Sequence, residues 1–384
     1  MKAKILITNF HPKRGGGHKT YVETIIKSKL IERFGIAVAA PEQSSIFEMC
    51  NNLYIQCHPL AFPGNVKELI GVGKSIIGLN RIYKSFPFDL IHCNGSRDHW
   101  IAVYWKLLFR KPTPLIRTRH AVKITRNDPV HWFVNQRLTF RQIYVCESMK
   151  HLCEEGKALK LRNSIVIPSG VDLEYYKPIV KDQVLTTRIG VGQRDFVFGS
   201  VAGLGAHKRV DVIVKAASEM KNERQFKIVL LGHEEGARKI LAFGRDLGVE
   251  NRIIYAGMVE DVRPYISIFD VGFVLSDSIE TISYAAREMM AMGTPLISSS
   301  YCGLRENVDE GVNGYLVRPG NVDEVKKAMV SFLEMSNDQY LSFRTAAREK
   351  AVKNFSVAQQ ISGLEEVYRE AVLSRRRTCE LSFD

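Results

Sequence analysis

Residues 271–298 read VGFVLSDSIETISYAAREMMAMGTPLIS and contain two apolar runs separated by a helical pattern. The first run is Val271–Leu275, and the second begins at Pro295. Between them, Tyr284–Met292 has the periodicity of an amphipathic helix. Continuous apolar runs, in contrast to alternating ones, are typical of parallel strands that are buried on both faces. This stretch therefore predicts a strand–helix–strand unit in a parallel sheet.

Short apolar runs of the same kind alternate with longer amphipathic stretches through the rest of the chain. The expected strands are residues 4–8, 36–40, 90–93, 115–118, 143–146 and 165–168 in the first half, and 196–202, 227–231, 253–256, 271–275, 295–298 and 315–317 in the second. Strict alternation of strand and helix favours an α/β fold of doubly wound, Rossmann-like sheets. Ligands of such sheets bind beyond the carboxyl ends of the strands, so we expect two domains that face each other across a cleft.

The length of 384 residues suits two domains of nearly equal size. A second strand–helix series begins after Pro178 and the polar residues that follow it. We therefore expect an N-terminal Rossmann-like domain over residues 1–178 and a C-terminal one over residues 179–359. The final helix, from about residue 360 to residue 384, is expected to pack back on the first domain.

The net charge of +13 is confined to the first half of the chain. Residues 1–180 contain 27 Lys and Arg against 13 Asp and Glu, whereas the remaining 27 basic and 28 acidic residues nearly cancel. A field of one sign attracts an anionic ligand or surface. No apolar run is long enough to cross a bilayer, and the N-terminus lacks the pattern of a signal peptide, so a cytoplasmic location is expected.

Two glycine-containing turns, each between a strand and a helix, are candidates for anion binding. The first includes Gly16 and Gly17, and the second includes Gly203, Lys208 and Arg209. Glycine lets the backbone approach a ligand, and a helix N-terminus offers it unpaired N–H groups. Cations normally avoid a helix N-terminus, so the lysine and arginine there favour a bound diphosphate. The alternatives are a turn without a ligand and a pair of solvated surface cations.

Two carboxylates stand out near the helix of the opening stretch. Glu280 would lie at the mouth of the strand Val271–Leu275, and Glu288 lies eight residues further, so that both tend to one face. The N–H groups of Thr281 to Ser283 lie beside the first acid, where they would hold phosphate or sugar oxygens. The alternative is an N-terminal glutamate favoured by the helix dipole together with one surface glutamate.

Taken together, these features resemble the retaining glycosyltransferases of family 4, which have the GT-B fold of two Rossmann domains. The resemblance runs nearly from end to end, with its motifs in the family's order. It is carried by Asp89-Leu90-Ile91-His92, Thr118-Arg119-His120, residues 165–172 (IVIPSGVD), the pair Glu280 and Glu288, residues 291–297 (AMGTPLI) and residues 311–317 (GVNGYLV).

The resemblance implies a role for each matching position. Among the catalytic residues, Glu280 would contact the transferred sugar and the diphosphate, Lys208 would neutralise the leaving diphosphate, and His120 would face the reacting sugar. Glu288 would hold the ribose hydroxyls of the nucleotide. The remaining expected donor-binding residues are Thr281, Ile282, Ser283, Arg209, Gly203, Gly232, Met258, Val259, Gly16 and Gly17.

The resemblance also implies a reaction without a metal or a cofactor, because the nucleotide sugar is itself a substrate. A diphosphate oxygen would accept the acceptor's proton during attack on the same face of the sugar. The chain has no Asp-x-Asp at a strand end, and its seven cysteines show no metal-ligand spacing. It departs from the family pattern at Gly203, in place of an arginine, at Thr281-Ile282-Ser283, in place of a glycine-rich turn, and at Ser169, in place of an asparagine. His207 and Arg209 are the candidates to compensate for the missing arginine.

The resemblance implies that the first domain binds the acceptor. The cations of this domain are concentrated over residues 97–126 among aromatic residues. Such a mixture suits an interfacial helix on anionic lipid. The expected acceptor or membrane contacts are Arg97, Trp105, Lys106, Arg110, Lys111 and Arg119. The alternative is that the aromatic residues belong to the core and that the charges only solvate the surface.

The sequence therefore predicts a retaining hexosyltransferase that uses a UDP-sugar, or next a GDP-sugar. Its expected acceptor is a lipid-linked or anionic glycan such as a lipopolysaccharide core, and its expected location is the inner face of the cytoplasmic membrane. Two other functions stay open: a catalytically silent sugar- or lipid-binding protein, and a UDP-sugar epimerase. No nucleic-acid module is recognisable, so nucleic acid is not an expected partner.

Overall fold

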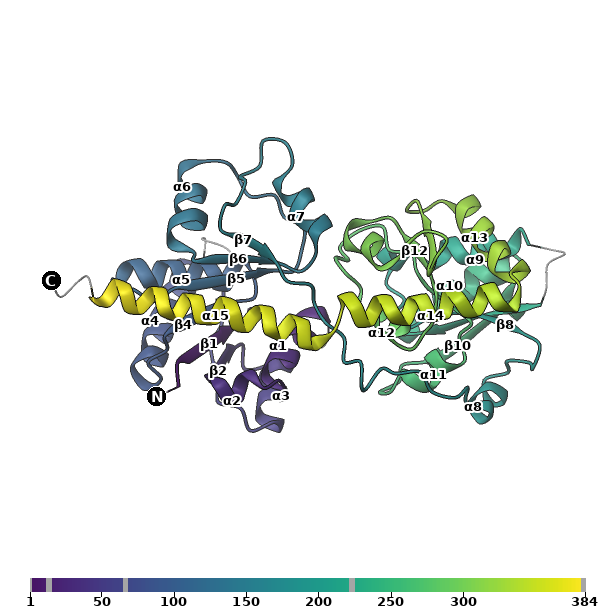
Figure 1. Cartoon of the computed structure of the whole chain (residues 1–384), viewed down its shortest axis with the longest axis horizontal. Coiled ribbons are helices and arrows are strands. Elements are labelled where there is room, and N and C mark those ends of the chain that lie inside the picture. Colours follow the sequence, from purple (N-terminus) through teal and green to yellow (C-terminus); the bar gives the residue numbers. More distant parts are fainter. Residues whose placement is uncertain (1, 12–15, 65–67, 221–224, 381–384) are drawn as a thin grey trace. The chain divides into compact units, whose positions relative to one another are not determined.

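The structure is a computed structural model, and it describes residues 2–11, 16–64, 68–220 and 225–380. The chain divides into two compact units. The first consists of Met1–Ser169 together with Ala358–Asp384, and the second is Gly170–Val357. Each unit contains one parallel sheet, which confirms the predicted fold class of two doubly wound α/β sheets (Figure 1).

The sheet of the first unit has seven strands in the order β3-β2-β1-β4-β5-β6-β7. They are β1 (Lys4–Thr8), β2 (Gly35–Ala40), β3 (Cys57–Pro59), β4 (Leu90–Cys93), β5 (Leu115–Arg119), β6 (Arg141–Tyr144) and β7 (Ser164–Val166). Strand β1 pairs with β2 on one side and with β4 on the other, in parallel. The order therefore reverses between β1 and β4, and ligands of open α/β sheets bind at such a point.

Helices cover both faces of this sheet, and alternate residues of β4 show the two layers. The helices are α1 (Gly17–Ile26), α2 (Leu30–Arg33), α3 (Ser45–Asn52), α4 (Leu69–Ser85), α5 (Ser96–Leu108), α6 (Pro129–Trp132), a π-helical segment (Phe133–Leu138), α7 (Glu147–Glu154) and α15 (Val357–Glu380). Ile91 and Cys93 belong to the core under α4 and α5, which includes Trp105. His92 points to the opposite face, where Nδ1 lies 2.6 Å from the Tyr368 hydroxyl of α15.

The last helix, α15, runs along the sheet of the first unit (Figure 1). Tyr368 is fully buried and packs edge-on against Phe34. At the surface, Arg141 forms an ion pair of 2.6 Å with Glu370. The helix therefore completes the first unit although it follows the second unit in the chain.

The sheet of the second unit has six strands in the order β10-β9-β8-β11-β12-β13. They are β8 (Phe196–Ser200), β9 (Phe226–Leu231), β10 (Ile253–Gly257), β11 (Val271–Val274), β12 (Leu296–Ser299) and β13 (Gly314–Val317). Its helices are α8 (Gln183–Arg188), α9 (Val210–Ser218), α10 (Glu234–Asp246), α11 (Arg263–Ser267), α12 (Tyr284–Ala291), α13 (Val322–Glu334) and α14 (Asn337–Asn354), with short 3-10 turns at Ala206–Lys208, Glu250–Arg252 and Cys302–Asn307.

Alternate residues of β8 pack into different cores, which shows that this sheet is covered on both sides. Phe196 and Phe198 pack into the core that contains α9 and α13, whereas Val197 packs into the core that contains α12. Both sets are almost entirely buried. Strands that are apolar at every position are therefore required here, as the opening stretch of the sequence predicted.

The segment that follows Ser169 belongs to the second unit, whereas the sequence placed the boundary after residue 178. Arg348 of α14 is responsible for much of this attachment. Its guanidinium donates to the carbonyl oxygens of Tyr176 at 2.9 Å, Leu173 at 3.2 Å and Ala291 at 2.5 Å. An arginine 175 residues away along the chain gives no local signal of this contact.

Most expected strands agree with the structure to within two residues, and the expected helices 210–220 and 284–292 are α9 and α12. Strand β3 was not predicted, because it is only three residues long and ends in proline. In the described residues, the structure contains no helix that is long and apolar enough to span a membrane.

Candidate active site

The reversal of strand order in the second unit lies between β8 and β11. The loop after β8 contains Gly203 and Lys208, and the loop after β11 contains Glu280. Both loops therefore emerge at the place where open α/β sheets bind their ligands. The sequence predicted these residues as parts of one site, and the structure brings them into contact.

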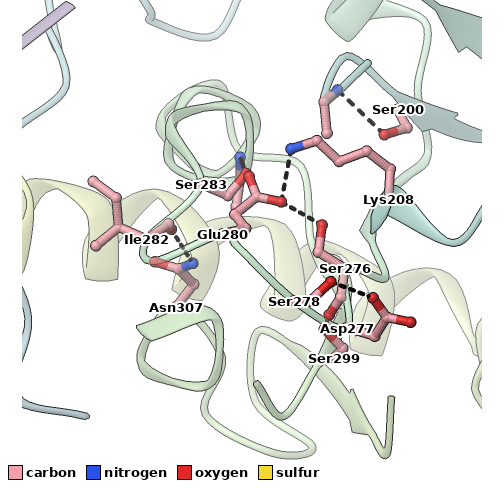
Figure 2. A network of polar contacts seen from close by, with 12 residues as sticks. Ser200, Lys208, Ser276, Asp277, Ser278, Glu280, Ile282, Ser283, Ser299 and Asn307 are labelled. Atoms are coloured by element: carbon pink, nitrogen blue, oxygen red, sulfur yellow. Dashed lines mark hydrogen bonds and ion pairs between the residues drawn. The ribbon is translucent and has the colours of Figure 1, made fainter. Parts of the chain in front are cut away.

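An ion pair joins the two loops, with Lys208 Nζ 2.7 Å from Glu280 Oε2 (Figure 2). Only 16% of the lysine side chain and 11% of the glutamate side chain are exposed. The Ser276 hydroxyl donates to the same carboxylate oxygen. Ser299 of β12 in turn donates to the Ser276 carbonyl at 2.5 Å. The glutamate is thus held by partners from two neighbouring strands before any ligand arrives.

Arg209 was expected to assist at the diphosphate, but its guanidinium already has two acidic partners. It lies 2.8 Å from Asp277 and 3.1 Å from Asp211. These contacts raise the pKa of Arg209 above its ordinary value. Burial lowers the pKa of His207, and the neighbouring Lys208 lowers it further, so the charged form of this imidazole is disfavoured. Neither side chain is a free cation that replaces the arginine missing at Gly203.

The loop between β11 and α12 adopts backbone angles that are unusual for its residues. Ile279 has φ 66° and Ser283 has φ 51°, where glycine is normally required. Asn307 fixes this loop, since its amide donates to the Ile282 carbonyl at 3.0 Å (Figure 2). The Ser283 hydroxyl caps α12 by accepting from the Ala286 N–H at 3.4 Å. Ile279 and Ser283 thus adopt a positive φ that glycine would adopt without strain.

The glycine positions at the other strand ends let three loops come close together. A Cβ added at Gly232 would lie 3.0 Å from the Leu204 side chain and 3.1 Å from Gly203. The Gly232 N–H donates to the Gly257 carbonyl at 3.0 Å. The predicted donor residues Met258 and Val259 follow directly, and Met258 is 68% exposed. The loops after β8, β9 and β10 therefore meet beyond the carboxyl ends of these strands.

Glu288 has a different environment from Glu280. Burial raises the pKa of its carboxyl group to about 7, and a hydrogen bond from the Tyr176 hydroxyl opposes this rise. Tyr176 belongs to the segment that Arg348 attaches to this unit. The two glutamates therefore have separate contacts, one with a lysine and the other with a tyrosine, although the sequence placed both on one helix face.

The first unit has a cluster of aromatic and imidazole rings at its own reversal point. His18 of α1 packs between His11 and His120, with ring centroids 4.5 Å and 4.4 Å away. His120 Nε2 lies 3.3 Å from Asn94 Oδ1, at the end of β4. Burial lowers the pKa of His18 to about 4 and that of His120 well below its ordinary value. These imidazoles are therefore neutral and suit hydrogen bonding to hydroxyl groups.

The glycine-rich turn of the first unit is described only in part. Gly16 has φ 92° and precedes α1, which begins at Gly17. Residues 12–15, which the sequence included in the same turn, lie outside the described residues.

The six residues expected to touch the acceptor or the membrane have different environments. Trp105 is completely buried, and its indole N–H donates to Asn80 at 3.3 Å. Arg119 is also buried, at 3% exposure. A membrane contact requires an exposed side chain, so burial argues against the membrane interpretation for these two residues, whereas a contact with the acceptor stays a prediction. Lys106 is partly buried and donates to the Thr113 carbonyl at 2.9 Å, and Lys111 lies over the Tyr83 ring. Arg97 and Arg110 are exposed.

Sequence reasoning missed several residues that support the site. Tyr176, Ser276 and Asn307 all contact or position a predicted site residue. Asn307 lies in the loop before the GVNGYLV motif, and Ser276 directly follows an expected strand, so position offered a weak signal for both. Tyr176 gave none, because its partner Glu288 is more than a hundred residues away.

Family models match both halves of the chain. The model described as Glycosyltransferase Family 4 covers residues 15–175, and the model described as Glycosyl transferases group 1 covers residues 186–350. The chain belongs to the family 4 glycosyltransferases. This agrees with the predicted resemblance and with the GT-B fold of two parallel α/β sheets.

Individual relatives of this glycosyltransferase are distant. UDP-Gal:alpha-D-GlcNAc-diphosphoundecaprenol alpha-1,3-galactosyltransferase of Escherichia coli is 24% identical over 322 residues, which cover 80% of this chain and 82% of that protein. A glycosyltransferase structure from Rickettsia africae has a TM-score of 0.85 at 18% identity, covering 97% of this chain and 99% of that one. Anabaena HepE in complex with UDP-glucose has a TM-score of 0.78 at 19% identity, covering 96% and 99%.

Ser283→Gly tests the strain in the loop before α12. Glycine removes the cost of a positive φ but loses the helix cap, and the first effect is the larger. We expect the free energy of unfolding in urea to rise by about 0.5–1 kcal/mol. Ser283→Ala loses the cap and keeps the strain, so it should lower stability by about 1 kcal/mol. Equal destabilisation by both variants would contradict a strained loop.

Glu288→Gln tests the raised carboxyl pKa through its effect on stability. Because the folded pKa of about 7 exceeds the unfolded value, ionisation of Glu288 destabilises the native state progressively between about pH 4.5 and pH 7. The variant should therefore match the native protein near pH 4 and exceed its unfolding free energy by about 1–3 kcal/mol at pH 8. The exposed Glu349→Gln is the control. A stability difference independent of pH would contradict the assignment.

Proposed function

We propose that this glycosyltransferase transfers a hexose from a UDP-sugar to a lipid-linked glycan with retention of configuration and without a metal. The observation that carries the proposal is the shielded Lys208–Glu280 ion pair at the strand reversal of the second unit. At this position Lys208 would release the Glu280 carboxylate and bind the diphosphate of the donor instead. Fixed cations of this kind stabilise the charge that develops on a departing diphosphate.

Two further features support a nucleotide sugar as the donor. Glu288, with its hydrogen-bonding Tyr176, offers a carboxylate to ribose hydroxyls. The closely packed loops at Gly203, Gly232 and Gly257 would present backbone N–H and carbonyl groups to the nucleotide, without bulky side chains in the way. The HepE structure contains UDP-glucose and the galactosyltransferase relative uses UDP-Gal, which favours UDP over GDP. In the described residues, no cluster of three or more His, Cys, Asp or Glu suits a metal ion, and metal independence stays a prediction.

The first unit supports a lipid-linked acceptor at an anionic membrane surface. Helix α4 exposes Leu69, Ile70 and Ile77, and helix α5, which packs beside it, exposes Leu107 and Leu108. Exposed cations lie on the same helices or just after them, among them Lys74, Arg81 and Arg110. An apolar surface bordered by cations suits anionic lipid. The galactosyltransferase relative acts on a diphosphoundecaprenol-linked sugar, which favours the same acceptor class.

Calorimetric titration with UDP, GDP, ADP and their sugar conjugates, without added metal, tests the donor site. We expect UDP and one UDP-sugar to bind selectively. Glu288→Ala should weaken UDP binding by about tenfold to a hundredfold, since each hydrogen bond to a charged group contributes about 1.5–3 kcal/mol. Glu349→Ala is the control and should bind like the native protein. Absence of binding by any nucleotide would favour a silent relative of the family.

Lys208→Ala tests the assignment to the leaving group. Release of UDP from the bound UDP-sugar should fall by about 10²–10³-fold, as for the loss of one oxyanion donor, whereas UDP affinity should change much less. Lys215→Ala removes an exposed lysine of the same helical region and should leave both quantities unchanged. A loss confined to UDP affinity would make Lys208 an anchor of the ground state instead.

A further inference from the structure

A cavity of about 330 Å³ lies within the first unit on the side of β5 away from the histidine cluster. Helix α5 lines it with His99 and Trp100, β5 lines it with Arg117 and Arg119, and the loop after β5 contributes residues 123–126. Thr118, between the two arginines, points to the other face, where its hydroxyl lies 2.7 Å from His92 Nε2. The cavity is therefore separate from the predicted site at His120.

The lining of this cavity is cationic. Arg117, Arg119, Lys123 and Arg126 contribute to it, and none of the described lining residues is acidic. Arg117 is 8% exposed and Arg119 is 3% exposed. Buried charges in proteins are normally paired, because an uncompensated charge away from water is costly. Two neighbouring buried guanidinium groups without a lining carboxylate thus require an explanation.

The two arginines differ in how they are held. Arg119 donates to the Thr125 hydroxyl at 3.0 Å and to the Lys123 carbonyl at 2.5 Å, so it is fixed against the loop. Arg117 Nε is buried without a hydrogen-bond partner, and in the described part of the chain no carboxylate lies within ion-pair distance of Arg117. Arg119 Nε is likewise buried without a partner, so each of the two guanidinium groups has an unused donor.

One acidic residue acts on Arg117 from behind the cavity. Asp98 is fully buried, and its Oδ2 accepts from the Thr8 hydroxyl and the Asn94 N–H, both at 2.8 Å. Its attraction does not offset burial, which lowers the pKa of Arg117 to about 9, with the charge of Arg119 adding to the effect. Asp98 therefore compensates the Arg117 charge only in part, and none of the described lining residues adds a second carboxylate.

His99 adds an acceptor to this set of donors. The Thr139 hydroxyl donates to the Val134 carbonyl at 2.8 Å, so it accepts from His99 Nε2–H at 2.8 Å. Burial keeps the imidazole neutral by lowering its pKa well below the ordinary value. Its Nδ1 is therefore a lone-pair acceptor, and it is buried without a partner. A protonated phosphate oxygen or a nearby hydroxyl matches this acceptor, whereas a simple halide does not.

The exposed part of the lining contains one large apolar residue, Ile124, together with the cations Lys123 and Arg126. Ile124 contributes to the lining and is 63% exposed. Val130, Trp132 and Phe133 do not line the cavity, but they flank its lining residue His131 in the chain and are 61%, 43% and 46% exposed. A ligand that combines an anionic head with an apolar body would contact both parts of this surface.

We propose that this cavity binds a phosphoryl group of the acceptor, with Arg117 and Arg119 as its guanidinium donors and His99 as an acceptor. Arginine suits this group, because its planar fork matches phosphate oxygens in a bidentate contact. The identity of the ligand as the acceptor rests on the proposed function, whereas the phosphoryl site itself rests only on these contacts.

Phosphate-dependent thermal stability, measured in the full chain with saturating UDP, tests the site. UDP occupies the donor site, so a remaining shift with sodium phosphate reports on a second site. We expect phosphate to raise Tm in the native protein and Arg117→Met to abolish that shift. Without phosphate, Arg117→Met should itself raise Tm, because it removes an uncompensated buried charge at nearly constant volume. Arg81→Met, on the exposed surface of α4, should keep the native response.

Octyl phosphate distinguishes the two sources of the phosphoryl group. If the group belongs to a lipid-linked acceptor, octyl phosphate should compete with phosphate and bind at least tenfold more tightly through contact with the exposed Ile124 and the apolar residues around His131. Binding of phosphate alone would overturn the acceptor assignment in favour of a free anion. No phosphate shift, together with a lower Tm for Arg117→Met, would overturn the site and make Arg117 a structural residue. Failure of UDP to bind in the same samples would instead count against the proposed donor function.

Discussion

Lys208 and Glu280 lie in loops that follow two different strands, and their contact of 2.7 Å ties those loops together where the strand order reverses. Both side chains are largely shielded from water, so each would be costly alone. Ser276 donates to the glutamate and is itself held by Ser299. Three strands thus determine the position of one carboxylate, and the carboxylate determines where the lysine rests.

This arrangement has a consequence for ligand exchange. A diphosphate that approaches Lys208 must compete with Glu280, so the resting ion pair reduces the gain from ground-state binding. A more negative leaving group competes better than the intact donor does, because its charge is greater. If Lys208 binds the diphosphate as proposed, the pair would favour the late, highly charged stage of the reaction over simple donor binding, which is the condition under which binding energy accelerates a reaction.

Much of the fold was predictable because buried parallel strands leave continuous apolar runs, and this signal identified twelve of the strands, including β8 and β11. It failed at β3, where three residues are too few for any period. The site was predictable where motifs have fixed places after strands, as for Lys208 and Glu280. The domain boundary and the burial of single side chains were not predictable, because residues far away in the chain determine them. Arg348 attaches residues 173–176 to the second unit, and Trp105 is buried by packing against Tyr83 and Phe88.

The charged residues of the first unit show why composition alone misleads about their role. Arg110 and Arg119 contribute equally to the net charge, yet one is exposed and the other is buried beside a second arginine. An exposed arginine is solvated and adds to a long-range field that salt screens. A buried arginine pair acts at short range and tolerates only a ligand that replaces the lost water. The positive half of the chain therefore contains two different features. One is a surface that attracts anions in general, and the other is the proposed phosphoryl site, whose buried donors would select one kind of anion.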